Sequence, residues 1–341
     1  MLLWLDGFED YGTSGNFLPT GVLGRKYGVG IPQAGYSGIS TGRFGTGYCM
    51  YWAYDGSTYI QTPALTTNDT LIIGVAVKFP RMYDEGAFMV LYDGATAGVN
   101  FRFRATGEIA VYRDSTLLGT TSGASMRPGI WYFVEFKIKC NDSTGTYEVR
   151  IGGVTVGSGT GLDTKSGSNA YHDRVRITAT SLNYSYYDDF YICDASGAAN
   201  NDFLGNVKIE SLRPNAAGDS TQLSPSAGDN YTCVDDAIAN DDTDYVEDDT
   251  TDQKDLYNFG ATTLTTINGV IAWVDCRETD ADNFSVKIPC KSGATESDDT
   301  AQSVGTPSYV TFKRVLETDP NTAAAWATAD LNAAQFGIKI G

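Results

Sequence analysis

Short runs in which apolar and polar residues alternate recur along the whole chain, with turn-forming residues between them. The clearest is WYFVEFKIK, residues 131–139. One face of this run would collect apolar side chains, those of Tyr132, Val134, Phe136 and Ile138, and the other would carry Trp131, Phe133, Glu135, Lys137 and Lys139. A period of two residues is typical of a half-buried β-strand, because successive side chains point to opposite faces of a sheet. We therefore expect Phe136 in a core and Lys137 at the surface.

The same alternation predicts many further strands. They are expected at residues 70–79, 87–94, 99–105, 108–114, 146–157, 174–180, 188–194 and 206–214, and then at 256–260, 266–277, 283–291 and 307–317. No segment before residue 320 shows the period of an amphipathic helix, and a short alanine-rich helix and a last strand, FGIKI, are expected after it. Many short strands separated by Gly, Asp, Asn, Ser and Thr predict an all-β sandwich.

The stretch PNAAGDSTQLSPSAGDN, residues 214–230, lacks this alternation. Its content of Pro, Gly, Ser and Asn predicts a connection between domains. A chain of 341 residues, 42% of them hydrophobic, is long and apolar enough to fill two cores. We therefore predict one domain at residues 1–214 and a smaller β-sandwich domain at residues 215–341.

The formal net charge of the chain is −18. An acidic field repels phosphate groups and anionic lipids, which argues against nucleic acid and membrane surfaces as partners. No stretch approaches the roughly 18 consecutive apolar residues that a membrane-spanning helix needs. The first residues, MLLWLDGFEDYG, lack a basic region, and Asp6 interrupts their apolar run, so no signal peptide is predicted.

Six cysteines are scattered along the chain without any Cys-x-x-Cys pair, namely Cys49, Cys140, Cys193, Cys233, Cys276 and Cys290. This spacing and the single histidine argue against a zinc site. We expect buried, reduced thiols, as in a protein made in a reducing cytoplasm.

Several of these runs together resemble the concanavalin A-like and laminin-G-like jelly rolls. WYFVEFKIK is followed by the hairpin GTYEVRIGGVTVGSGT, and DDFYICD opens a later strand with an acidic pair, an order that spans about residues 1–213. The longer continuation, which includes NNDFLGNVKIESLRPN, DLYNFG and ADLNAAQFGIKI, is similar to virion structural proteins of tailed phages. The resemblance to that family covers both predicted domains.

The resemblance implies a jelly-roll domain over residues 1–214 and a structural role in a virion, as a head decoration protein or a tail protein made in the cytoplasm of a bacterial host. It implies contacts with other virion proteins of the capsid or tail, and a homo-oligomer. It carries over no catalytic residue, cofactor site or metal ligand, so no enzyme is expected. The alternative is a carbohydrate-binding module or adhesin that recognises host surface glycans, and an enzyme on the same fold is a third hypothesis.

Candidate catalytic carboxylates were sought because glycoside hydrolysis needs two facing acids. Glu278, Asp280 and Asp282 form the only alternating acidic triplet, but they lie in RETDADN between two predicted strands, where a solvated turn is the simpler explanation. Asp84 and Glu85 sit beside a glycine in a predicted loop. None of these residues is predicted to be catalytic.

His172 is the only histidine and lies in the predicted loop GSNAYHDR, beside Asp173. A nucleophile activated by histidine requires a geometrically placed base, and this pattern gives no sign of one. We expect His172 to have a surface or capping role.

Two acidic segments were considered as metal sites. Residues 235–255 hold ten acids and one lysine, but they lack the spacing and central glycine of an EF-hand, so a solvated acidic loop is expected rather than calcium. Asp188 and Asp189 open a predicted strand, where backbone hydrogen bonds at a turn are expected. No metal ligand is predicted.

Aromatic residues are concentrated in YCMYWAYDGSTY, residues 48–59, and in NYSYYDDFY, residues 183–191. Sugar faces stack on exposed Tyr and Trp rings, so these runs are candidates for a glycan platform. Alternation would place about half of each run in the core, and packing in the core or against a neighbouring subunit is the first interpretation. The glycine-rich elements GTGYC and GSGTG follow no strand-to-helix transition, which argues against a phosphate site.

Overall fold

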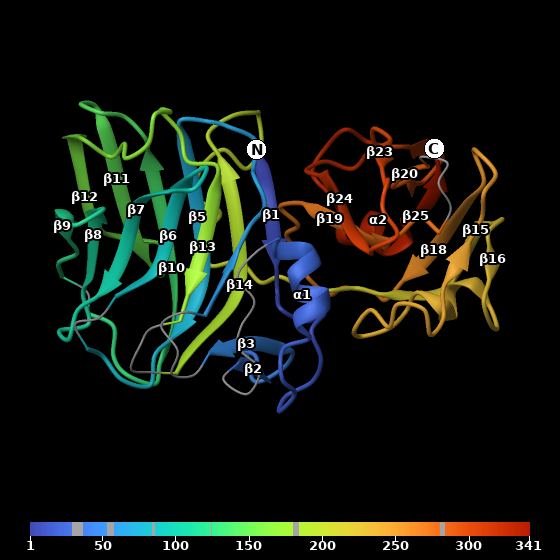
Figure 1. The fold of residues 1–341 in the computed structure, drawn as a ribbon, viewed down its shortest axis with the longest axis horizontal. Helices are drawn as coiled ribbons and strands as arrows, with labels where there is room; N and C mark the ends of the chain where they lie inside the picture. The colour runs from blue at the N-terminus through green and yellow to red at the C-terminus, as the bar shows by residue number, and fades with distance from the viewer. Residues whose placement is uncertain (29–36, 53–57, 84–85, 124, 180–183, 280–283) are drawn as a thin grey trace. The chain divides into compact units, whose positions relative to one another are not determined.

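The computed structural model describes residues 1–28, 37–52, 58–83, 86–123, 125–179, 184–279 and 284–341. The chain forms two compact units, Met1–Ile209 and Glu210–Gly341. Each unit is built of antiparallel strands with short turns (Figure 1). The all-β prediction is confirmed.

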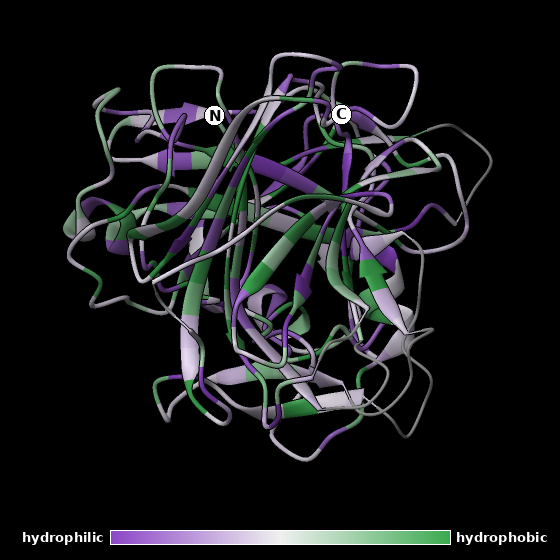
Figure 2. Ribbon diagram, turned by 90° about the vertical axis from the view of Figure 1, so that its left-hand side faces the viewer, coloured by the Kyte–Doolittle hydropathy of each residue, from purple (hydrophilic) through white to green (hydrophobic). Residues whose placement is uncertain are grey.

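The first unit is a sandwich of two antiparallel sheets (Figure 1). The eight-stranded sheet has the order β12 (Val154–Leu162), β11 (Gly145–Ile151), β10 (Trp131–Lys139), β5 (Thr70–Lys78), β14 (Ser185–Asp194), β3 (Tyr48–Trp52) and β2 (Ser37–Thr41), with β1 (Leu2–Asp6) also paired to β14. The six-stranded sheet has the order β4 (Tyr59–Gln61), β13 (Arg174–Thr178), β6 (Ala87–Asp93), β7 (Thr96–Phe103), β8 (Ile109–Arg113) and β9 (Thr116–Thr120). Hydrophobic and hydrophilic residues share the same strands, as a two-layer sandwich requires (Figure 2).

The core of this unit lies between the two sheets. Phe136 of β10 is fully buried and packs against Phe101 of β7 and Phe88 of β6, with ring centroids 3.9 Å and 6.1 Å away. Val134 and Ile138 are buried on the same face. The predicted register of β10 is therefore confirmed.

The opposite face of β10 differs from the expectation, because Phe133 and Glu135 are also buried. Arg43 packs over Phe133, and the segment that follows β14 covers Glu135. A strand is predicted at residues 206–214, but residues 206–213 form none. The backbone of this segment bonds to side chains instead, because Asp189 accepts from the amide of Ile209 and Arg43 donates to the carbonyl of Val207.

One helix was missed by the sequence analysis. Helix α1 (Thr20–Tyr27) buries Leu23, Lys26 and Tyr27, a single narrow stripe on eight residues. A stripe this short gives no clear helical period. The helix is held through its tertiary contacts, since the Tyr27 hydroxyl donates to Asp6 at 2.7 Å and the Lys26 ammonium lies 3.1 Å from the same carboxylate.

The second unit contains one seven-stranded sheet and two strand pairs. The larger sheet comprises β15 (Pro214–Thr221), β18 (Lys254–Phe259), β25 (Gln335–Ile340), β20 (Ser285–Lys287), β23 (Gln302–Ser303), β21 (Cys290–Ser292) and β22 (Thr295–Ser297). The pairs are β16 (Ser224–Pro225) with β17 (Val246–Glu247), and β19 (Val270–Cys276) with β24 (Val310–Leu316). Short helices occur at Asn230–Cys233 (η1) and Thr328–Ala333 (α2), the latter as predicted.

The core of the second unit lies between the larger sheet and the β19–β24 pair. Its buried residues are Ile267, Cys290, Leu316, Trp326, Ala334 and Phe336, with Phe259, Val270, Ala272 and Leu331 packed against them. The unit is therefore a small sandwich, as predicted.

The interpretation of residues 214–230 as a connection is wrong. Strand β15 begins at Pro214 and pairs with β18. Its residues alternate between half-buried and exposed, but they are small and polar, so hydropathy does not reveal the period. Pro214 fits because proline is tolerated at the first residue of a strand.

All six cysteines have free thiols, and five of them are buried. Burial raises the pKa of the Cys49 and Cys140 thiols to about 12. Among the described residues, no helix has the length and apolar character needed to cross a membrane.

Candidate functional site

Four side chains from four adjacent strands form one straight row across the outer face of the eight-stranded sheet. Trp131 of β10 lies opposite Lys78 of β5, Lys78 lies opposite Tyr186 of β14, and Tyr186 lies opposite Tyr51 of β3. Residues directly opposite each other in antiparallel strands project to the same side. Three strand spacings make this row, which we call the aromatic row, about 14 Å long.

The rings of the aromatic row contact one another, and two of them contact the ammonium group of Lys78. The Lys78 ammonium lies 4.1 Å from the ring centroid of Tyr186 and 4.9 Å from that of Trp131. The Tyr51 ring is 5.8 Å from the Tyr186 ring and 6.3 Å from that of Tyr184, which is 47% exposed. All four members of the row are half-buried, so their ring faces and the ammonium are partly open to solvent.

The row continues past Tyr51 at the edge of the sheet. Gly38 of β2 lies opposite Tyr51, and a Cβ atom at Gly38 would come within 2.9 Å of the Tyr51 ring. Glycine is therefore required for the ring to lie flat over β2. Phe17 is bridged to Gly38 and is 63% exposed.

Behind the aromatic row, the same outer face is closed by Arg43. Its guanidinium packs over the Phe133 ring, 5.0 Å from the centroid, and lies 2.5 Å from the Asp189 carboxylate. The backbone amide of Arg43 donates to Asp188 at 2.8 Å. Asp188 and Asp189 were expected at a strand edge, but they lie buried inside β14 at a bulge, where the pairing with β5 is interrupted. The expected backbone hydrogen bonds are present, because Asp188 also accepts from the amide of Asp189.

This carboxyl pair titrates abnormally. Burial and the neighbouring charge of Asp189 raise the pKa of Asp188 to about 8. Burial also raises the pKa of Asp189, while the Arg43 guanidinium opposes that change. One guanidinium faces two buried carboxyl groups, so the group as a whole holds a proton near neutral pH.

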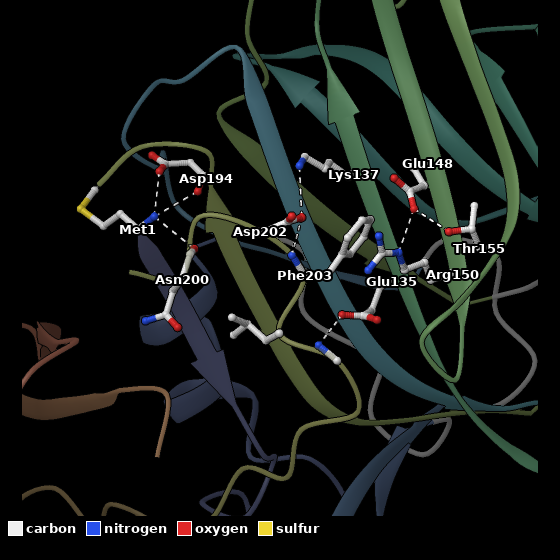
Figure 3. Close-up of polar contacts among 12 residues, drawn as sticks. Met1, Glu135, Lys137, Glu148, Arg150, Thr155, Asp194, Asn200, Asp202 and Phe203 are labelled. Atoms are coloured by element: carbon white, nitrogen blue, oxygen red, sulfur yellow. Dashed lines mark hydrogen bonds and ion pairs between the residues drawn. The ribbon is translucent and has the colours of Figure 1, made fainter. Parts of the chain in front are cut away.

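Farther along the face, residues 202–209, which we call the covering segment, lie over the sheet. Glu135 is fully buried and accepts a hydrogen bond from the backbone amide of Gly205 at 2.8 Å (Figure 3). It also accepts one from the hydroxyl of Tyr191 at 2.6 Å. The Tyr191 hydroxyl accepts from the amide of Leu204. A Cβ atom at Gly74 would lie 2.0 Å from the Tyr191 ring, so this packing needs glycine on β5.

Two further contacts hold the covering segment onto the sheet (Figure 3). The Arg150 guanidinium packs on the ring of Phe203, 3.8 Å from its centroid, and Lys137 pairs with Asp202 at 3.1 Å. Upstream of the segment, the α-amino group of Met1 donates to the carbonyl of Asn200 at 3.1 Å. The outer face therefore has a closed region and, at the aromatic row, an open one.

His172 was expected at the surface, and that expectation is wrong. Its side chain is only 3% exposed, and neither ring nitrogen has a hydrogen-bond partner among the described residues. Burial lowers the pKa of the imidazole to about 4, although the nearby carboxylate of Asp93 acts in the opposite direction. A neutral imidazole packs at this position, which the loop-like sequence around His172 does not reveal.

Of the candidate carboxylates, Glu278 alone lies among the described residues. Glu278 is buried and accepts the amide of Phe284 at 3.2 Å. Asp280 and Asp282, and the pair Asp84–Glu85, lie outside the described residues.

The acidic stretch 235–255 ends in a structural carboxylate. Asp255 is fully buried and accepts hydrogen bonds from the amides of Gln222 and Leu223 and from the side chains of Asn230 and Tyr257. Within the described ranges, no group of three or more His, Cys, Asp or Glu side chains is arranged to hold a metal ion.

The sequence analysis found only part of the aromatic row. Tyr51 and Tyr186 belong to the two aromatic runs singled out there, whereas Lys78 and Trp131 stand at the ends of strands predicted separately. Their juxtaposition depends on the register between β5 and β10. Local alternation shows which face a residue takes and does not show its neighbour across the sheet.

Comparisons with known proteins give matches in structure alone, since no protein-family model and no curated protein sequence matches the chain. Alginate lyase Aly36B is 16% identical with a TM-score of 0.41, over 56% of this chain and 96% of that chain. Domain 4 of the extracellular arabinanase AbnA from Geobacillus stearothermophilus is 16% identical with a TM-score of 0.37, over 56% and 93%. A carbohydrate esterase from Shiga toxin-encoding bacteriophage phi24B is 12% identical with a TM-score of 0.32, over 46% and 85%. These likenesses concern the β-sandwich alone.

Proposed function

We propose that this chain is a non-catalytic glycan-binding protein and that the aromatic row is its binding surface. The observation that carries the proposal is the division of the outer face. Arg43 and the covering segment bury Phe133, Glu135 and Tyr191 on that face, whereas the row of Trp131, Lys78, Tyr186 and Tyr51 stays half-exposed beside them.

The chemistry of the row suits a saccharide. Tyr and Trp rings offer flat apolar faces that pack against the C–H-rich faces of pyranose rings, and their hydroxyl and indole groups form hydrogen bonds at the rim. Ring faces from strands about 4.8 Å apart follow a linear direction across the sheet. A row of this kind fits an extended glycan chain better than a compact small molecule, which binds in concave pockets.

The absence of catalysis is part of the proposal. Two titratable groups of the same sheet face serve other purposes, because Glu135 and Tyr191 lie beneath the covering segment and bond to each other. Asp189 is paired with Arg43. A general acid or base must reach the substrate, and these buried groups would need the segment to open first.

The proposal is tested by titrating the protein with a panel of oligosaccharides. Replacing Tyr186→Ala should weaken binding of the best saccharide by roughly tenfold or more, since it removes the central ring of the row. Tyr112→Ala is the matched control, because Tyr112 is a half-buried tyrosine of the six-stranded sheet with Arg102 over its ring at 4.3 Å. Equal binding by Tyr186→Ala and the unmodified protein would refute the proposal.

The biological setting that we propose is a virion. The basis for this setting is the resemblance of the runs NNDFLGNVKIESLRPN, DLYNFG and ADLNAAQFGIKI to tailed-phage structural proteins. That resemblance supports a place in the head or tail of a particle, with a host surface glycan as the partner of the row. Many copies on one particle would add avidity to a weak single site. Fractionation of purified virions should find the chain at a fixed copy number, and its absence from particles would leave a free adhesin in place of a virion component.

A further inference from the structure

We infer that the aromatic row selects acidic glycans, with the ammonium of Lys78 pairing with the carboxylate of a uronic acid residue. This inference rests on the proposed glycan-binding function and specifies its ligand class. It depends on the position of Lys78 in the middle of the row, between Trp131 and Tyr186.

The Lys78 ammonium has an unusual environment for this chain. Several other lysines form ion pairs with carboxylates, as Lys137 does with Asp202 and Lys26 does with Asp6. Among the described residues, Lys78 forms no ion pair and its ammonium donates no hydrogen bond. Its contacts are the two ring faces. Three N–H donors are therefore available to a ligand.

A similar sandwich on the other sheet shows what a purely structural cation looks like. The guanidinium of Arg176 lies between the rings of Tyr59 and Tyr92, at 3.7 Å and 4.2 Å from their centroids. Its Nε donates to the side-chain oxygen of Gln61 at 2.9 Å, so that cation has a protein partner. Lys78 also contacts two rings, but it has no such oxygen partner among the described residues. A ligand carboxylate would supply it.

The charge near the row permits an anion to approach despite the net charge of −18. Among the described residues, Asp188 lies one position behind Lys78 on the same face of the sheet, since it pairs with Ala76. Asp189 pairs with Arg43, and the pKa of Asp188 is raised to about 8, so these two groups leave little negative charge at neutral pH. Pairing in a half-desolvated setting is stronger than in bulk water.

The ammonium contacts two rings that stand at 74° to each other with their centroids 6.4 Å apart. A pyranose ring that stacks on the part of either ring that the ammonium does not cover would carry its exocyclic carboxylate toward that ammonium. A neutral hexose would place a primary alcohol there and gain only a neutral acceptor. Hydrogen bonds to charged groups are about twice as strong as neutral ones.

The test uses a hexagalacturonate and the same oligomer with its carboxylates reduced to primary alcohols, titrated into the full chain at low and high salt. The unmodified protein should bind the acidic oligomer at least roughly tenfold more tightly, and this preference should shrink as salt rises. Lys78→Met keeps the apolar stem between the rings and should remove the preference, while Lys78→Arg should retain it.

The outcomes separate the two proposals. Equal affinity of the unmodified protein for both oligomers, or a preference that survives in Lys78→Met, would overturn the role of Lys78 while leaving glycan binding intact. Lys78 would then serve only to hold the rings by cation–π contact. If neither these oligomers nor any other saccharide binds in a manner that depends on Tyr186, the proposed function itself fails.

Discussion

Trp131 and Phe133 stand two residues apart on the same face of the same strand, yet they lie in different environments. Phe133 is 4% exposed, under Arg43 and beside Tyr191. Trp131 is half-buried and contacts Lys78 and Tyr186 in the open row. The strand places both side chains on the outer face, and only the segments that cross that face decide which one meets solvent.

Arg43 and the covering segment, to which it bonds at Val207, explain why Phe133 is buried and Trp131 is not. The amides and carbonyls of the segment bond to side chains of the sheet, among them Glu135 and Asp189, so it lies over the strands without joining the sheet. Polar groups of a segment that crosses a sheet need such partners, because unpaired buried amides are costly. These partners are available behind the aromatic row, where the segment lies.

The largest effect on stability is expected at Phe133, in the closed region of the outer face. Phe133→Ala should lower the free energy of unfolding by about 3–5 kcal/mol, as large-to-small replacements in a packed interior do. Its folded fraction should bind saccharide with unchanged affinity. Denaturant unfolding followed by tryptophan fluorescence measures the first quantity. A loss below about 1 kcal/mol would mean that the covering segment is not firmly packed on the sheet.

His172 lies in a second closed region, and its buried imidazole should make the free energy of unfolding depend on pH. The folded-state pKa of about 4 lies below the usual value of 6.5, so between these pH values the unfolded chain binds a proton that the folded chain does not. Stability should therefore fall as pH drops from about 6.5 to 4, by about 3 kcal/mol from this group.

Other carboxyl groups contribute to the acid response, so the prediction concerns a difference between variants. Replacing His172→Leu should remove the contribution of the imidazole, so the free energy of unfolding should change less with pH across this range. Parallel curves for the two proteins would show that the imidazole is solvated in the folded state.

The sequence predicted the parts of the fold that depend on local alternation. The face assignment of Phe136, the C-terminal strand and the short helix before it are examples. It missed β15, whose small polar residues hide the period, and α1, whose apolar stripe is too short.

The sequence points to individual residues of the candidate site, but it does not predict how they are arranged. Tyr51 and Tyr186 stand out as members of aromatic runs, but whether they are buried depends on what crosses the sheet. Lys78 joins them only through the pairing of β5 with β10 and β14. The burial of His172 likewise comes from distant segments that fold around its loop, such as Gly98, where a Cβ atom would lie 3.0 Å from the imidazole.

The smallest expected change in stability belongs to Trp131→Ala, and it is paired with a large change in binding. Because Trp131 is half-buried in the open row, its loss should lower the free energy of unfolding by less than about 1 kcal/mol. Saccharide affinity should fall by roughly tenfold or more. Measuring unfolding and saccharide binding side by side for Trp131→Ala and Phe133→Ala tests the central claim most directly. The account predicts that the first variant loses binding and keeps its stability, while the second does the reverse; two variants that lose both properties in proportion would contradict it.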